Sequence, residues 1–202
     1  MTADASLIAE RLTAQLLAGP PARDPVAVAE RLLAVQAQDG RGARLAVRAR
    51  STGLVAADVD RALTVDRSLV VTWLNRGTLH LVRSDDYPWL QALTTPPVRS
   101  ANARRLSQEG VSADSAERAL GVIERSLAAD GQLGRDELAE RLRAAGVRAQ
   151  GQALVHLLML ASLRGLAVRG PVVGGRQAYV LVREWLGERR PPDRGRALAE
   201  LA

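Results

Sequence analysis

The chain has 202 residues, of which 47% are hydrophobic and 25% charged, a composition that excludes a disordered chain and indicates a folded soluble protein. It contains no cysteine, which excludes disulfides and thiolate metal sites and favours the reducing cytoplasm. The formal net charge is +6 and all basic residues are arginines, so phosphate groups are natural partners, although a GC-rich genome would also enrich arginine.

Residues 1–95 are predicted to form a first module of helices followed by a β-hairpin. The first helix, over residues 5–18, is ended by Gly19-Pro20-Pro21. The second follows the N-cap Asp24 and ends in the pair Gln36 and Gln38. Short helices are expected over 43–50 and 56–63, and strands over 69–74 and 79–83, around Asn75-Arg76-Gly77.

Residues 96–187 repeat this order and are predicted to form a second module. Helices are expected over residues 98–108, 115–129, 135–145 and 151–165, and strands over 166–169 and 177–182, whereas a helix over 85–93 closes the first module. The apolar helix 151–165 is too short to span a membrane, so no membrane partner is expected. Residues 188–202 are predicted to be a linker and the start of a truncated further module. The predicted fold class is therefore mainly α with small β-hairpins, built from tandem winged-helix modules.

The best candidates for chemistry are Gln36 and Gln38, which are separated by one small apolar residue. Glutamine amides accept and donate hydrogen bonds in fixed directions but do no strong acid or base chemistry. Such a pair can orient a water molecule, provided that the chain becomes extended near Ala37 so that both side chains point to one side. The alternative is a helix that ends in polar residues before the stop signal Asp39-Gly40.

Three polar residues, Arg76, Thr78 and His80, alternate with Leu79 and Leu81 along the expected second strand of the first hairpin. We expect the leucines to enter the core and the polar residues to line a cleft or to face water. Phosphate contacts are expected from seven arginines, which could also be solvated surface residues: Arg41, Arg44, Arg48, Arg99, Arg104, Arg105 and Arg176.

No metal site and no cofactor are predicted. The two histidines, His80 and His156, are far apart in the sequence and have no cluster of carboxylates beside them. His156 lies in an apolar helix and is interpreted as a buried histidine with one satisfied hydrogen bond. Asp85 and Asp86 are interpreted as helix N-capping residues rather than as a catalytic pair of acids.

Several segments, VQAQDG, RGTLHLV, QGQALVHLLMLASLRGL and RGPVVGGRQAYVLV, together resemble the azinomycin-resistance type of winged-helix DNA-binding protein. That family consists of DNA glycosylases built from tandem winged helices, which excise N-alkylated purines and unhook interstrand crosslinks. Its catalytic motif of glutamine, an apolar residue and glutamine matches Gln36, Ala37 and Gln38. Family members continue into a third winged helix, and this chain stops before it.

The resemblance predicts a DNA glycosylase that acts on double-stranded DNA in the cytoplasm. We expect it to be monofunctional, because the chain has no lysine to form a Schiff base. A cationic alkylpurine departs readily, so amides that position water against the sugar C1′ would suffice. The alternatives are a non-catalytic winged-helix regulator or scaffold and a protein-interaction module. The sequence leaves the preferred lesion and the oligomeric state open.

Overall fold

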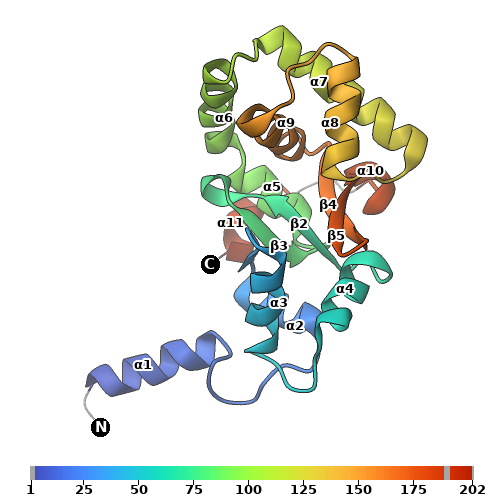
Figure 1. Cartoon of the computed structure of the whole chain (residues 1–202). Coiled ribbons are helices and arrows are strands. Elements are labelled where there is room, and N and C mark those ends of the chain that lie inside the picture. The colour runs from blue at the N-terminus through green and yellow to red at the C-terminus, as the bar shows by residue number, and fades with distance from the viewer. Residues whose placement is uncertain (1–2, 189–191, 202) are drawn as a thin grey trace.

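The computed structural model describes residues 3–188 and 192–201, which form helices around one small antiparallel sheet (Figure 1). The helices are α1 (Ala3–Ala14), α2 (Pro25–Leu32), α3 (Gly40–Arg48), α4 (Ala56–Thr64), α5 (Tyr87–Thr94), α6 (Pro96–Gln108), α7 (Ala113–Asp130), α8 (Arg135–Ala144), α9 (Gly151–Leu163), α10 (Val182–Trp185) and α11 (Arg194–Leu201). The predicted fold class, mainly α with small hairpins in tandem winged-helix modules, is confirmed.

The five strands form one sheet rather than two separate hairpins. They are β1 (Val35–Gln36), β2 (Leu69–Trp73), β3 (Leu79–Arg83), β4 (Ala167–Val173) and β5 (Arg176–Leu181), in the spatial order β1-β3-β2-β4-β5. The two expected hairpins, β2-β3 and β4-β5, are present, and β2 pairs with β4 through Val71 and Arg169. This pairing joins the two halves of the chain, whose division into modules at residue 95 stays a prediction.

The sheet is buried on both faces because its central strands alternate between two hydrophobic clusters. Val71, Trp73 and Leu81 belong to a large cluster with the cores of α2–α4 and α6–α9. Val70 and Val82 belong to a smaller cluster with α5 and α11. The helices of the large cluster form two groups, with α2–α4 below the sheet and α6–α9 above it in the view of Figure 1. Strand β2 therefore consists entirely of buried residues, as expected for a strand covered on both sides.

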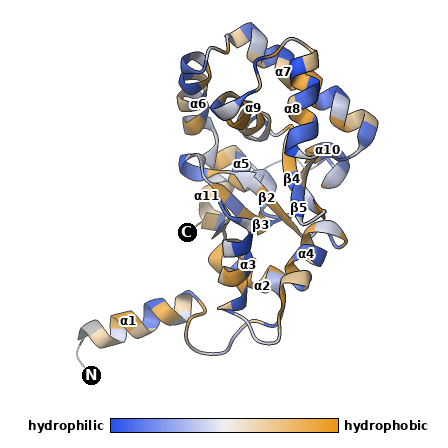
Figure 2. Ribbon diagram, in the orientation of Figure 1, coloured by the Kyte–Doolittle hydropathy of each residue, from blue (hydrophilic) through white to orange (hydrophobic). Residues whose placement is uncertain are grey.

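Helix α9 is buried in the middle of the upper group of helices, as its apolar sequence requires (Figure 2). By contrast, α1 projects away from the body (Figure 1) and exposes the apolar side chains of Leu7, Ile8 and Leu12. Within the residues that the structure describes, no helix is long and apolar enough to cross a membrane. The predicted linker after residue 187 lies partly outside the described residues, and α11 after it packs on α5.

The expectation that the second helix ends in Gln36 and Gln38 is wrong. Helix α2 ends at Leu32, and Leu33 takes a positive φ of 63°. Asp39 is not a stop signal but the N-cap of α3, because its carboxylate accepts hydrogen bonds from the backbone N–H groups of Arg41 and Gly42. The segment between the two helices is extended, and Gln36 lies in the edge strand β1.

Asp86 also differs from the sequence interpretation. It precedes α5, but its side chain makes no capping hydrogen bond to the helix. Instead its carboxylate accepts two hydrogen bonds from Arg83, at 2.7 and 3.0 Å, and one from Trp89 Nε1 at 3.3 Å. Arg83 also contacts Glu30 at 2.6 Å, so this ion pair fastens β3 to both α2 and α5.

Gly170 in β4 lies directly against the indole of Trp185, and we expect Gly170→Ala to be destabilising. A Cβ at residue 170 would lie 2.7 Å from Trp185 Nε1, and Arg67 stacked on the ring at 4.0 Å restricts its retreat. The free energy of unfolding should fall by about 1–3 kcal/mol in urea denaturation. Gly121→Ala, inside α7 and facing only the flexible end of Arg125, should raise it by up to about 1 kcal/mol. Equal free energies of unfolding for Gly170→Ala and Gly121→Ala would contradict the close packing of Gly170 against Trp185.

Candidate active site

The two glutamines of the predicted site lie at the edge of the sheet where β1 pairs with β3. Gln36 stands opposite His80 in this pairing, so their side chains are cross-strand neighbours. Both glutamines are exposed, whereas Ala37 between them is 3% exposed. Gln38 Oε1 accepts a hydrogen bond from the backbone N–H of Leu79 at 3.3 Å. This bond holds the amide carbonyl against β3 and leaves the NH2 group as a donor.

Thr78 and His80 lie beside this edge, whereas Arg76 does not. His80 Nδ1 lies 3.0 Å from the backbone oxygen of Thr78, and its Nε2 lies 3.5 Å from Thr78 Oγ1. The expected burial of Leu79 and Leu81 is confirmed. Arg76, however, sits in a 3-10 turn with φ of 60° and lines a different hollow, near α6. The predicted alternation fails at Arg76 because that residue belongs to the turn and not to the strand.

A cleft of about 310 Å³ opens beside Gln38, between the first hairpin and the second half of the chain. Trp73 and Leu79 of the β2-β3 hairpin form part of its wall, and Met159 of α9 and Tyr179 of β5 form another part. The polar side chains that line it are Gln38, Arg135, Gln152, His156 and Arg169. Residues from both halves of the chain therefore meet in one polar cleft with an aromatic wall.

Gln36 lines a different hollow, of about 280 Å³, which it shares with Gln15 and Arg50. Arg50 donates from Nε to the backbone oxygen of Gln15 at 2.9 Å, so the segment after α1 is held over this hollow. The extended backbone that the glutamine hypothesis required is present. Of the two amides, however, it is Gln38 that lines the polar cleft, and Gln36 lies next to His80 on the same edge.

His156 lines the cleft, which its position in an apolar helix did not indicate. Its Nδ1 lies 2.8 Å from Asn102 Oδ1, and Asn102 Nδ2 donates to the backbone oxygen of His156 at 3.1 Å. Asn102 is 1% exposed, so this pair of bonds fixes the imidazole with Nδ1 as the donor and Nε2 as the acceptor. The single satisfied hydrogen bond expected for His156 is present, but the residue is half-buried rather than buried.

Burial lowers the pKa of both His80 and His156, and the charge of Arg105 lowers that of His156 further. Both imidazoles are therefore neutral at pH 7. Since the unfolded chain binds protons near pH 6.5 and the folded one only below it, stability should be lost as the pH falls through and below 6.5. Chemical denaturation at pH 8 and pH 5.5 measures this loss. A His80→Gln and His156→Gln double variant should lose less stability, and an equal loss would contradict the assignment.

The seven arginines predicted to hold phosphates are placed in three different ways. Arg44 is bound to Asp60 and to the backbone of Gly40, and Arg99 donates to the last carbonyl of α9, so these two guanidinium groups have protein partners. Arg105 and Arg176 form exposed ion pairs with Glu109 and Asp136, which water and salt weaken. The remaining three are exposed: Arg41, Arg48 and Arg104. The DNA-binding role of these arginines stays a prediction.

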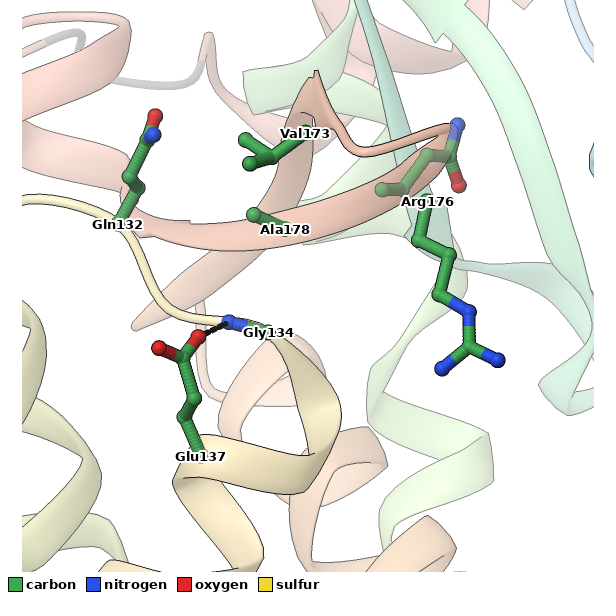
Figure 3. Close-up of a pocket in the computed structure, with 7 residues that line it drawn as sticks. Gln132, Gly134, Glu137, Val173, Arg176 and Ala178 are labelled. Carbon is green, nitrogen blue, oxygen red and sulfur yellow. Dashed lines mark hydrogen bonds between the residues drawn. The ribbon is translucent and has the colours of Figure 1, made fainter.

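A further hollow lies between the tip of the β4-β5 hairpin and the start of α8 (Figure 3). Arg176 lies on one side of it, and on the other the carboxylate of Glu137 accepts a hydrogen bond from the backbone N–H of Gly134 at 2.6 Å. Glu137 thus caps the helix and supplies negative charge. Because this hollow contains one predicted residue and the cleft beside Gln38 joins many polar groups, we regard the cleft as the candidate site.

Within residues 3–188 and 192–201, no group of three or more His, Asp or Glu side chains is arranged to hold a metal ion. The polar groups of the cleft are amides, neutral imidazole and guanidinium, and its lining contains no carboxylate. Such a set can hold an anion or orient water by hydrogen bonds. It is a poor set for acid or base catalysis near neutral pH.

Two successive modules of helices and a hairpin define the protein as a tandem winged-helix protein. The model of one family, "DNA glycosylase AlkZ-like", matches residues 29–202. The chain therefore belongs to the AlkZ-like DNA glycosylase family, and the family resemblance found in the sequence is confirmed.

Among solved structures, the chain is similar to the Streptomyces sahachiroi DNA glycosylase AlkZ, with a TM-score of 0.74 and 25% sequence identity. The match covers 97% of this chain and 54% of that one, so the chain spans about half the length of its structural relative. No curated protein matches the sequence.

Proposed function

We propose that the protein is a monofunctional DNA glycosylase of the cytoplasm that excises N-alkylated purines from double-stranded DNA, crosslinked purines included. Membership of the AlkZ-like family over residues 29–202 supports the reaction class. The observation that carries the assignment of the site is the amide of Gln38, held by the backbone N–H of Leu79 at the mouth of a polar cleft.

The reaction asks little acid or base chemistry of the protein. An N7-alkylated purine carries a positive charge, so it takes the electron pair of the glycosidic bond and leaves as a neutral base. Water then adds to C1′ of the oxocarbenium-like sugar and loses one proton to the solvent, which leaves an abasic site. The barrier is lowered mainly by holding the water in line with C1′ and by dipoles that favour positive charge on the sugar.

Gln38 is suited to hold that water. A carbonyl oxygen has two lone pairs, so Oε1 can accept from the water as well as from Leu79 N–H. Because the backbone of β3 fixes the amide, its dipole needs no reorganisation when charge develops. Gln36 and His80 stand side by side on the same edge and are assigned to substrate binding next to the lesion, with Thr78 supporting the His80 ring.

Release of 7-methylguanine from alkylated duplex DNA tests this function directly. We expect the chain to release the base and to leave abasic sites, with no strand cleavage, since a lyase step would require an amine nucleophile that the lysine-free sequence lacks. Salt-sensitive duplex binding without release of a base from methylated or crosslinked duplex would instead support a non-catalytic winged-helix DNA-binding protein.

A further inference from the structure

Arg169 of β4 occupies an unusual position in the cleft. Its guanidinium lies 4.7 Å from the ring centre of Trp73 and 5.2 Å from that of Tyr179. Arg169 Nε donates a hydrogen bond to the hydroxyl of Tyr179 at 3.0 Å. Both aromatic residues are almost fully buried, at 4% and 1% exposure, so the guanidinium is locked in one orientation beside them.

This half-buried cation has no carboxylate partner within the described part of the chain, and no Asp or Glu lines the cleft. Of the other half-buried arginines, Arg44 and Arg83 pair with Asp60 and Asp86, and Arg50 and Arg99 donate to backbone carbonyl groups. A guanidinium has five N–H groups, and within the described residues only the one on Nε of Arg169 is donated to the protein. Because an unpaired cation is costly to remove from water, the remaining donors suit an anion that enters the cleft.

A second cation lines the same cleft. Arg135, at the start of α8, is exposed and forms no ion pair among residues 3–188 and 192–201. The amides of Gln38 and Gln152 add neutral donors. A cationic alkylpurine does not fit this environment, since two positive charges would repel it and Arg169 already covers the aromatic faces on which a base would stack.

We propose that the cleft is a phosphate subsite, in which Arg169 and Arg135 hold one phosphodiester of the DNA strand that carries the lesion. The proposal rests on the proposed function for the identity of the DNA. A phosphate held next to Gln38 would fix the distance from the backbone to the attacking water. Its negative charge would also screen the positive charge that develops on the sugar from the two arginines.

The first test is the salt dependence of binding to an undamaged duplex. Each phosphate contact adds about 0.9 to the slope of log affinity against log salt concentration. We expect Arg169→Gln and Arg135→Gln each to lower the slope by about 1 and Arg118→Gln, an exposed arginine of α7, to leave it unchanged. Arg169→Lys should keep most of the slope, because it keeps the charge. Unchanged slopes in both cleft variants would overturn the proposal.

The second test removes charge from the DNA instead of the protein. In a scan with a single neutral methylphosphonate along the strand, the wild-type protein should lose affinity at a particular position near the lesion site. At that position the methylphosphonate should not lower the affinity of Arg169→Gln further, whereas it should lower the affinity of Arg118→Gln as much as that of the wild type. Should Arg169→Gln unfold, Arg135→Gln serves in the same comparison. Identical profiles for all variants would overturn the subsite.

Both tests measure binding and not excision, so the subsite and the reaction fail separately. If the wild type binds duplex and the variants show these slope changes, but the wild type releases no base, only the proposed function is contradicted. Inorganic phosphate at millimolar concentration provides the remaining comparison. If inorganic phosphate fails to displace duplex from the wild type, the result would support a phosphodiester that is held in the cleft by contacts to the neighbouring nucleotides as well. Full displacement, together with an unchanged salt slope in the cleft variants, would overturn the assignment to DNA.

Discussion

Gln38→Ala is expected to reduce the single-turnover rate of 7-methylguanine release by about 100-fold or more, because positioning of the water supplies most of the catalysis in this account. The variant also leaves the backbone N–H of Leu79 without its Gln38 partner, but Leu79 lies at the start of β3 and lines the open cleft, where water can replace the amide, so the fold should persist. Gln36→Ala should have a smaller effect on the rate, since Gln36 lines a separate hollow. The rate is measured with enzyme in excess over alkylated duplex.

Gln132→Ala provides the matched control for these variants. Gln132 is exposed in the turn before α8 and lines the hollow of Figure 3 instead of the cleft. Its rate should equal that of the wild type within about twofold. If Gln36→Ala lost as much activity as Gln38→Ala, the two amides would act as one unit and the assignment of separate roles would be wrong.

The largest expected loss of stability follows from breaking the ion pair between Arg83 and Asp86. The side chain of Asp86 is 10% exposed and receives two of its hydrogen bonds from Arg83. Arg83→Met would leave a buried carboxylate with Trp89 Nε1 as a remaining donor. The free energy of unfolding should fall by about 3 kcal/mol, measured in urea.

Two further variants distinguish burial from ion pairing as such. Arg183→Met breaks an exposed pair with Glu124 and should change stability by less than about 1 kcal/mol. Combining Arg83→Met with Asp86→Leu removes both buried charges and should recover most of the loss. A double variant as unstable as Arg83→Met alone would mean that Arg83 acts through its contact with Glu30 or through packing.

Local patterns in the sequence predicted most elements of the fold. The helices over 56–63, 115–129 and 135–145 follow from apolar spacing and lie within two residues of α4, α7 and α8. Both hairpins follow from alternating apolar strands around glycine. The end of α2 was mistaken because Asp39 and Gly40 are compatible with stopping one helix and with starting the next, and the capping bonds of Asp39 decide between these readings.

The candidate site depends on contacts that no local pattern contains. Gln38 and the neighbouring polar strand were identified by their residue types, but the cleft arises because β2 pairs with β4 through Val71 and Arg169. That pairing brings the second half of the chain, with His156 among its residues, against the first hairpin. Arg169 lay outside every predicted set, since nothing in a strand sequence shows that its guanidinium lies against Trp73 without an acidic partner.

The most direct test of the central claim compares binding and excision in a variant that carries both Gln36→Ala and Gln38→Ala. Both side chains are exposed at the edge of the sheet, Gln36 in β1 and Gln38 in the segment after it, so the variant should fold. Because phosphate contacts dominate the affinity for duplex DNA, loss of the Gln36 contact should change binding to alkylated duplex by no more than a few-fold. We expect it to retain binding and to release no measurable 7-methylguanine. Full excision by this variant, at unchanged binding, would contradict the claim that the amides at the edge of the sheet carry out the chemistry.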